Sequence, residues 1–233
     1  MERLDKFLVS QGLGSRKEVT RWIKDGRVQV GGEVVTDSAR KIAPESESVT
    51  LDGREVVYKK FLYILMNKPA GVLSATEDSR QKTVLDLLPP ELSRRGLFPA
   101  GRLDKDTTGL LIITDDGDFA HRMLAPKSHV FKRYRAVLER PVTEADVKAF
   151  ESGIDFGELH FAPARLWPGE EENTAYTEIR EGKFHQVKRM FEAVGNRVLA
   201  LQRVQIGSLA LPEELAPGDA REMTNDEVKA VFM

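Results

Sequence analysis

A nine-residue polar loop, Gly101 to Gly109, runs straight into the apolar segment Leu110 to Ile113, and this junction constrains the fold more than any other part of the chain. Four consecutive branched apolar residues predict a strand that is buried inside a sheet. The loop places Arg102 and Asp104 between its glycines. A carboxylate beside an arginine, on a loop held by a buried strand, is typical of a functional site.

The composition limits the classes of protein to consider. The 233 residues, 41% of them hydrophobic, suffice for one large or two modest domains, and we expect two. The absence of cysteine excludes a disulfide framework, a zinc ribbon and a thiol nucleophile. The start of the chain is charged and lacks an apolar signal segment, and no apolar run reaches the ~20 residues of a membrane span. We therefore expect a cytoplasmic protein without a membrane partner.

The net charge is only −2, but the charges are segregated along the chain. Residues 94–135 hold nine Lys/Arg against five Asp/Glu, and residues 180–203 hold six against two. The intervening 136–179 hold three against ten. Such runs occur on ordinary solvated faces; the alternative is that both basic segments fold onto one phosphate-binding surface. The sequence motifs described below favour the second interpretation.

Residues 1–58 have the pattern of a small unit with two helices and a hairpin. Leu4, Phe7 and Leu8 share one helical face, and Ser15 with Glu18 predicts a capping box that begins a second helix. The sequence V-Q-V-G-G-E-V-V that follows predicts a strand, a Gly-Gly turn and a strand.

This unit resembles an S4 RNA-binding domain through its R-L-D-K-F-L opening, its S-R-K-E helix start and its hairpin. Basic residues on a helix are usually a solvated face, but together with the opening and the hairpin they favour RNA binding. The resemblance implies that the RNA contacts come from Arg3, Lys6, Arg16, Lys17, Arg21 and Lys24.

A second domain is expected over residues 61–233. Residues 61–66 predict a buried strand that ends at Asn67-Lys68-Pro69. Helices are expected at 83–88, 118–125, 144–152, 184–194 and 225–231, and strands at 110–114, 132–138, 174–180 and 197–201. The chain is therefore predicted to be α+β.

Five carboxylates within fifteen residues raise the question of a divalent-metal site: Asp104, Asp106, Asp115, Asp116 and Asp118. The last three follow the apolar strand and predict a turn in which Asp118 caps a helix, and they lack the spacing of a calcium loop. We therefore expect no metal. Asp106, with the two threonines after it, is expected to hold the loop through hydrogen bonds to the backbone.

Other chemistries find no support in the sequence. There is no Walker loop, dinucleotide-binding turn or nucleophile elbow. The four histidines, at 121, 129, 160 and 185, have no metal-ligand spacing, and each is expected to be structural or to face RNA. A lone carboxylate that acts as nucleophile or base must remain ionised, which requires a cation beside it. The candidate cations lie on the helix expected at 184–194, where Lys188 and Arg189, like His185, are turned away from the core face.

Four motifs resemble, in order, those of the pseudouridine synthases of the RsuA and RluA type: G-R-L-D at 101–104, K-R-Y at 132–134, G-K-F-H-Q-V-K at 182–188 and L-Q-R-V-Q-I-G at 201–207. The resemblance implies that Asp104 is catalytic, that Lys188 pairs with it, that Tyr134 stacks on the uracil and that Leu201 forms a wall under the base. It also implies substrate contacts from Arg102 and RNA contacts from Arg133 and Arg189. The chain departs from the pattern at Lys183, where the motif has Arg, and at Phe184, where relatives often have Tyr.

The resemblance implies a mixed, largely antiparallel catalytic sheet and the isomerisation of one uridine in ribosomal RNA, without metal or organic cofactor. We expect base flipping followed by attack of Asp104 on the sugar or the base. The stretches 75–88 and 121–129 favour 16S rRNA, in the helix 18 region and within a small-subunit assembly intermediate, over 23S rRNA. The rival interpretations are a non-catalytic ribosome-assembly protein and an rRNA methyltransferase, of which the latter lacks its nucleotide-binding turn. A monomer is the default expectation.

Overall fold

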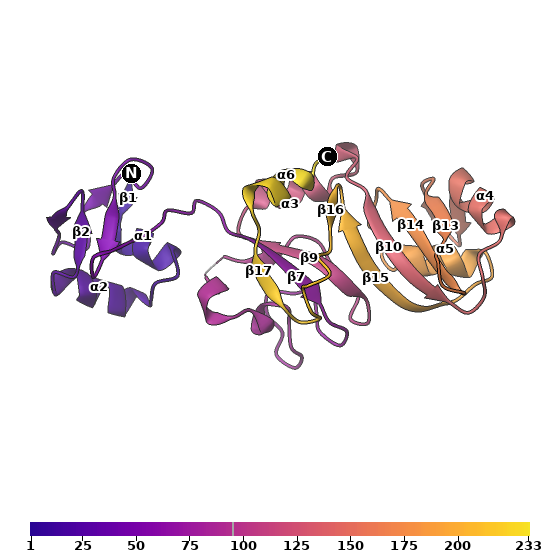
Figure 1. The fold of residues 1–233 in the computed structure, drawn as a ribbon, viewed down its shortest axis with the longest axis horizontal. Helices are drawn as coiled ribbons and strands as arrows, with labels where there is room; N and C mark the ends of the chain where they lie inside the picture. The colour runs from indigo at the N-terminus through magenta and orange to yellow at the C-terminus, as the bar shows by residue number, and fades with distance from the viewer. Residues whose placement is uncertain (95) are drawn as a thin grey trace. The chain divides into compact units, whose positions relative to one another are not determined.

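The computed structural model describes residues 1–94 and 96–233, which divide into two compact units (Figure 1). The first unit comprises Met1–Leu62 together with Pro89–Gly96, and the second comprises Tyr63–Leu88 and Leu97–Met233. The second unit differs from the domain expected over residues 61–233, because Pro89–Gly96 belongs to the first unit.

The first unit has the two helices and the hairpin expected from its sequence. Its elements are β1 (Glu2–Arg3), α1 (Leu4–Ser10), α2 (Arg16–Lys24), β2 (Val28–Val30), β3 (Glu33–Val34), β4 (Lys41–Ile42), β5 (Val49–Leu51), β6 (Arg54–Glu55) and the 3-10 turn Pro90–Leu92. The Ser15 side chain and the Glu18 side chain form the predicted capping box at the start of α2. Leu4, Phe7 and Ile23 from the two helices pack against Val28 of the four-stranded sheet β3-β2-β5-β6.

The second unit is built on a mixed sheet. Its elements are β7 (Tyr63–Lys68), β8 (Phe98–Pro99), β9 (Thr108–Thr114), α3 (Gly117–Leu124), β10 (Lys132–Leu138), α4 (Glu144–Ser152), β11 (Ile154–Phe156), β12 (Leu159–Phe161), β13 (Arg165–Pro168), β14 (Thr174–Ile179), α5 (Gln186–Ala193), β15 (Val198–Ile206), β16 (Leu209–Ala210), β17 (Ala220–Glu222) and α6 (Asn225–Ala230). Short 3-10 turns lie at Leu85–Leu87 and Pro126–Ser128.

The strands follow the order β13-β14-β10-β15-β9-β7-β17, with β16 beside β15 and β8 beside β9. Within the described ranges, β15 with β9 is the parallel pair of this sheet and the other pairs are antiparallel. The predicted α+β class and the mixed, largely antiparallel sheet are therefore confirmed.

Helices cover the two ends of this sheet (Figure 1). At the β7–β9 end, Phe119 of α3 packs with Leu65, Leu110 and Phe232 in one apolar core. At the other end α4 packs near β13, and Phe150 of α4 lies against Phe191 of α5 with ring centroids 5.0 Å apart.

Several expected elements have different bounds. The helix expected at 83–88 is only the 3-10 turn Leu85–Leu87, and the strand expected at 197–201 continues to Ile206. The prediction that Asp118 caps α3 was wrong, because Asp116 is the cap and its Oδ1 accepts a hydrogen bond from the Phe119 backbone at 3.0 Å. Asp116 also accepts a hydrogen bond from the Tyr63 hydroxyl, which fixes it beneath the helix start.

Candidate active site

The loop that carries Asp104 is positioned where β9 pairs with β15. Thr108 lies opposite Gln202 and Gly109 opposite Arg203 in the parallel register. At Gly109, where φ is +101°, an added Cβ would lie 2.2 Å from the Arg203 carbonyl oxygen. Only glycine permits this backbone approach, and the approach places the preceding loop beside the segment of β15 that contains Leu201.

A buried lysine holds the loop from below. Lys68, the last residue of β7, is fully buried, and its ammonium group donates hydrogen bonds to the carbonyl oxygens of Asp104 at 3.1 Å, Lys105 at 3.3 Å and Thr107 at 2.9 Å. Burial lowers the pKa of this lysine to about 8. Lys68 was expected only to lie where the buried strand 61–66 ends, and its role in holding the loop was missed, although a lysine between a buried strand and a proline is an unusual signal.

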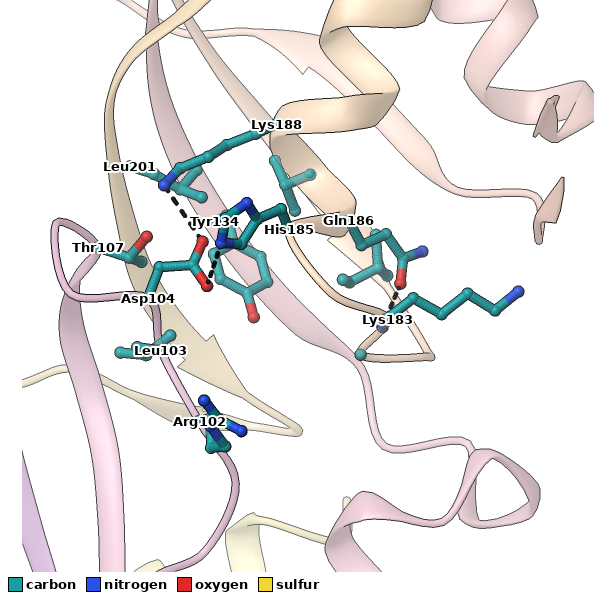
Figure 2. Close-up of a pocket in the computed structure, with 13 residues that line it drawn as sticks. Arg102, Leu103, Asp104, Thr107, Tyr134, Lys183, His185, Gln186, Lys188 and Leu201 are labelled. Atoms are coloured by element: carbon teal, nitrogen blue, oxygen red, sulfur yellow. Dashed lines mark hydrogen bonds and ion pairs between the residues drawn. The ribbon is translucent and has the colours of Figure 1, made fainter. Parts of the chain in front are cut away.

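The side chains of Asp104, Lys188 and His185 point toward one another in Figure 2. The Lys188 ammonium lies 3.2 Å from Asp104 Oδ2, and His185 Nε2 lies 3.5 Å from Asp104 Oδ1. The carboxylate is about a quarter exposed, at 27%. It is thus accessible from the pocket while a cation stands next to it, which is what a carboxylate nucleophile or base requires.

A second carboxylate shares the same cation. Asp106 Oδ1 accepts a hydrogen bond from the Lys188 ammonium at 2.6 Å, and this bond lowers the pKa of Asp106. Burial opposes the charge of Lys188, but the hydrogen bonds to Asp106 and Asp104 outweigh it and raise the lysine pKa. Asp106 was expected to hold its own loop through hydrogen bonds to the backbone, and one backbone hydrogen bond to its carboxylate is present. Its bond to Lys188 of α5 was not foreseen.

The start of α5 explains why Lys188, and not Arg189, reaches Asp104. Val187, Met190 and Phe191 are buried against the sheet. His185, the residue before the helix, has a left-handed backbone with φ 53°. Lys188 therefore faces the loop, whereas the Arg189 guanidinium lies 5.0 Å from the Phe184 ring centroid. His185 was expected to be structural or to face RNA, and its contact with Asp104 was missed.

A narrow pocket of about 60 Å³ opens at the Asp104 carboxylate. Arg102, Tyr134 and Leu201 line it together with Lys188, so the structure brings all the expected substrate-contacting residues to one place. Tyr134 and Leu201 are both 7% exposed and come from the paired strands β10 and β15. The pocket thus has one charged wall and one apolar wall.

The expected RNA-contacting residues of this unit lie outside the pocket lining. Arg133 precedes Tyr134 on β10, and neighbouring side chains of a strand point to opposite faces. Arg133 pairs with Glu178 on β14 at 2.6 Å and lies near the Trp167 ring. The alternation that directs Tyr134 into the pocket therefore directs Arg133 away from it.

The basic residues expected to bind RNA in the first unit differ in their partners. Arg3 and Arg16 pair with the buried Asp5, at 2.8 Å and 3.5 Å, and Arg21 lies 3.6 Å from Asp25. Lys6, Lys17 and Lys24 are exposed and form no ion pair within residues 1–94 and 96–233. A concave patch on α2 is lined by Arg16, Lys17, Thr20, Arg21, Lys24 and Asp25.

Neither a cluster of metal ligands nor a membrane-spanning helix is present in the described ranges. No group of three or more His, Asp or Glu side chains lies close enough together to hold a metal ion. No described helix has both the length and the apolar character needed to cross a bilayer.

Comparison with known proteins agrees with these motifs. The profile of the family described as RNA pseudouridylate synthase matches residues 62–193, and the S4 domain profile matches residues 2–48. An uncharacterised RNA pseudouridine synthase of Bacillus subtilis (strain 168) is 47% identical, with 97% of this chain and 96% of that protein covered. A ribosomal small subunit pseudouridine synthase A of Yersinia pestis is 43% identical (98% and 97% covered), and that of Escherichia coli (strain K12) is 40% identical (98% and 99% covered).

A solved structure supports the fold. The crystal structure of a pseudouridylate synthase covers 99% of this chain and 100% of its own, with a TM-score of 0.67 and 33% identity. The family expected from the sequence motifs is confirmed, because its profile spans more than half of the chain and the relatives match nearly all of it. The chain therefore belongs to the RNA pseudouridine synthase family, in a form with an N-terminal S4 domain, and it is an isomerase.

Proposed function

We propose that this synthase converts one uridine of small-subunit ribosomal RNA to pseudouridine, in the helix 18 region of 16S rRNA. The support comes from relatives in Yersinia pestis and Escherichia coli that are named ribosomal small subunit pseudouridine synthases, which are 43% and 40% identical over nearly their whole length. A 16S rRNA within an assembly intermediate, where the helix is still accessible, is the expected substrate.

The observation that carries the chemistry is the ion pair between Asp104 and Lys188 at the mouth of the narrow pocket. The Lys188 ammonium, 3.2 Å from Oδ2, supplies the neighbouring cation that a carboxylate nucleophile or base requires. Asp104 is therefore available as a nucleophile or as a base, and we assign it the catalytic role. Lys188 is assigned the role of keeping Asp104 anionic.

RNA capture involves both units. Lys17 and Lys24 of α2 bind phosphates, and Arg102 holds the strand near the pocket. A base inside a helix cannot reach Asp104, so the target uridine is turned out of its stack, as in other enzymes that act on nucleobases. Tyr134 and Leu201 then enclose the flat uracil ring between apolar surfaces.

The reaction moves the base from nitrogen to carbon. The bond between C1′ of the ribose and N1 of the uracil breaks, the uracil turns within the pocket, and C1′ joins C5. N1 takes up a proton and C5 releases one, so the composition of the RNA does not change. Asp104 starts this sequence in one of two ways. It attacks C1′ as the bond to N1 breaks, and its own bond to C1′ then breaks as C1′ joins C5; or it removes a proton from the sugar, which is returned when C1′ joins C5. Lys188 serves both routes.

Release of tritium from RNA labelled at uridine C5 tests the proposal. We expect release from 16S rRNA or its assembly intermediates with the wild type and none with Asp104→Asn. Asp106→Asn is the matched control, because Asp106 touches the same lysine but lies 75% exposed and lines no part of the narrow pocket. It should retain most of the activity, because the amide oxygen introduced by this substitution can still accept the hydrogen bond from Lys188. Loss of activity in Asp106→Asn with retention in Asp104→Asn would reverse the assignment.

The target is tested separately by mapping pseudouridines in rRNA from a strain that lacks the gene. Loss of one pseudouridine in 16S rRNA is expected. Loss confined to 23S rRNA would overturn the small-subunit assignment and leave the chemistry of Asp104 intact.

A further inference from the structure

Phe184 is a large apolar residue that the fold leaves in solvent at the edge of the catalytic centre. Its side chain is 65% exposed, although it stands next to His185, which contacts Asp104. Single exposed apolar residues are common on protein surfaces. The position and surroundings of Phe184 distinguish it from that background.

The ring is held in place. The left-handed backbone of His185 folds the two side chains onto each other, with ring centroids 3.7 Å apart and planes inclined by 22°. Behind them, the buried Gln186 accepts a hydrogen bond from the Lys183 backbone at 3.0 Å, and the Lys183 ammonium donates to the His160 carbonyl. A ring that is fixed before binding loses little conformational entropy when a partner covers it.

Phe184 lines a wide opening of about 700 Å³ that also reaches Asp104. Three cationic side chains line the same opening: Arg102 and Lys105 from the loop before β9, and Lys183. Arg102 is exposed and forms no ion pair in the described part of the chain, whereas Lys105 donates to the Gln81 side chain and Lys183 lies 2.8 Å from Glu181. The negative side chains on this lining are Asp104 and Asp78, and the Asp78 carboxylate already accepts from the backbone of Arg80 and Gln81.

Proteins recognise single-stranded RNA with exposed aromatic rings, on which the bases stack, and with nearby cations that contact the phosphates. Phe184 and the cations around it form this combination. The narrow pocket beside Tyr134 accepts the target base, so the nucleotide next to it in the strand must lie in the wider opening. We propose that Phe184 is the stacking platform for the nucleobase adjacent to the flipped uridine, with Arg102 facing the intervening phosphate. The proposal rests on the base-flipping function assigned above and deepens it, because it adds a contact outside the uracil pocket.

Binding to a catalytically silent protein tests the proposal without interference from turnover. The probe is a stem-loop from the rRNA that the wild type modifies, and the protein carries Asp104→Asn. Phe184→Ala should weaken binding by on the order of ten-fold, Phe184→Leu should weaken it similarly because it keeps bulk without a ring, and Phe184→Tyr should bind like Phe. Circular dichroism and thermal melting should not change, because the residue is mostly exposed.

The base that stacks is identified with RNAs that lack one nucleobase. Removing the base on one side of the target should weaken binding to the Phe184 protein and abolish the difference between Phe184 and Phe184→Ala. Removing a base several nucleotides away should leave that difference intact.

Equal affinities of the Phe, Ala and Leu proteins would overturn the proposal. So would a ten-fold loss that persists with each abasic RNA, since Phe184 would then act on the protein alone. A fall in kcat with unchanged binding, measured with Asp104 restored, would instead assign Phe184 to holding His185. If the 16S assignment is wrong, the wild type will modify a different RNA. The stacking test then uses a stem-loop from that RNA, so the two failures can be told apart.

Discussion

The Lys188 ammonium lies 3.2 Å from Asp104 Oδ2, and it also donates a hydrogen bond of 2.6 Å to Asp106. One cation therefore links α5 to two carboxylates of the loop before β9. We expect Lys188 to stabilise the charge of Asp104 and Asp106 to help hold the lysine in place, which would give the two acidic neighbours different roles.

Replacing Lys188 by Met should remove the cation and retain the length of the side chain. Asp104 would then stand in a partly buried pocket without a counter-charge, and we expect kcat to fall by roughly 10²-fold or more. Lys188→Arg should restore a substantial part of the activity because it keeps the charge. Tritium release under saturating RNA distinguishes these variants, and equal activity of the Met and Arg proteins would contradict the electrostatic role.

Lys68→Met should loosen the loop of residues 101–109, which carries Asp104. The substitution leaves the carbonyl oxygens of Asp104, Lys105 and Thr107 without their donor, although it also removes a buried charge. The net loss in the free energy of unfolding should be about 2–4 kcal/mol, with lower activity because Asp104 is displaced. Urea denaturation measures the loss. A stable protein with full activity would show that the loop does not depend on Lys68.

The same lysine gives a pH dependence of stability with a definite sign. Burial lowers the pKa of Lys68 from 10.5 to about 8, and it lowers that of Lys132 equally. Between these values the unfolded chain binds more protons than the folded protein, so the free energy of unfolding should rise with pH. Denaturation midpoints from about pH 7.5 to about pH 9.5 should increase in the wild type, and the increase should be smaller in Lys68→Met.

The parts of the site that the sequence predicted share one property: each lies in a short, ordered motif. The motifs point to Asp104, Tyr134, Lys188 and Leu201, and the fold brings these four side chains to one pocket. The helix period suffices to decide that Lys188 points away from its buried neighbour Val187, and the strand period that Tyr134 points to the opposite face from Arg133 and Arg135. Their roles in catalysis stay predictions until the variants are tested.

What the sequence could not supply depends on contacts between distant segments. The backbone of His185 turns left-handed, which no periodicity predicts, and this turn brings its ring to Asp104. The hydrogen bonds from Lys68 to the loop of residues 101–109 require the antiparallel register of β7 and β9. Asp116, and not Asp118, caps α3, and its carboxylate is held in place by a hydrogen bond from the Tyr63 hydroxyl of β7.

Gly109→Ala should disrupt the join between β9 and β15. A methyl group there would approach the Arg203 carbonyl oxygen to 2.2 Å, and φ +101° is unfavourable for alanine. The combined cost should be about 3 kcal/mol or more. Gly117→Ala is the matched control, since no atom lies within 4 Å of its added Cβ at the start of α3, and it should be neutral or up to about 1 kcal/mol stabilising. Thermal unfolding of both variants checks the difference.

Removing two lysines of α2 should weaken RNA binding in a salt-dependent way. Lys17 and Lys24 are exposed and form no ion pair among the described residues, so phosphate contact costs them no internal partner. The slope of log affinity against log salt is negative, and Lys17→Ala with Lys24→Ala should reduce its magnitude by about 1.5, because each phosphate contact releases close to one counterion.

Lys41 is the matched control, because it is exposed in the same unit but lies on β4 instead of α2. Lys41→Ala should leave the salt slope nearly unchanged. An equal reduction by Lys41→Ala would mean that the first unit contributes a diffuse positive field, whereas a reduction confined to the α2 variant identifies the helix as the surface that follows the RNA backbone.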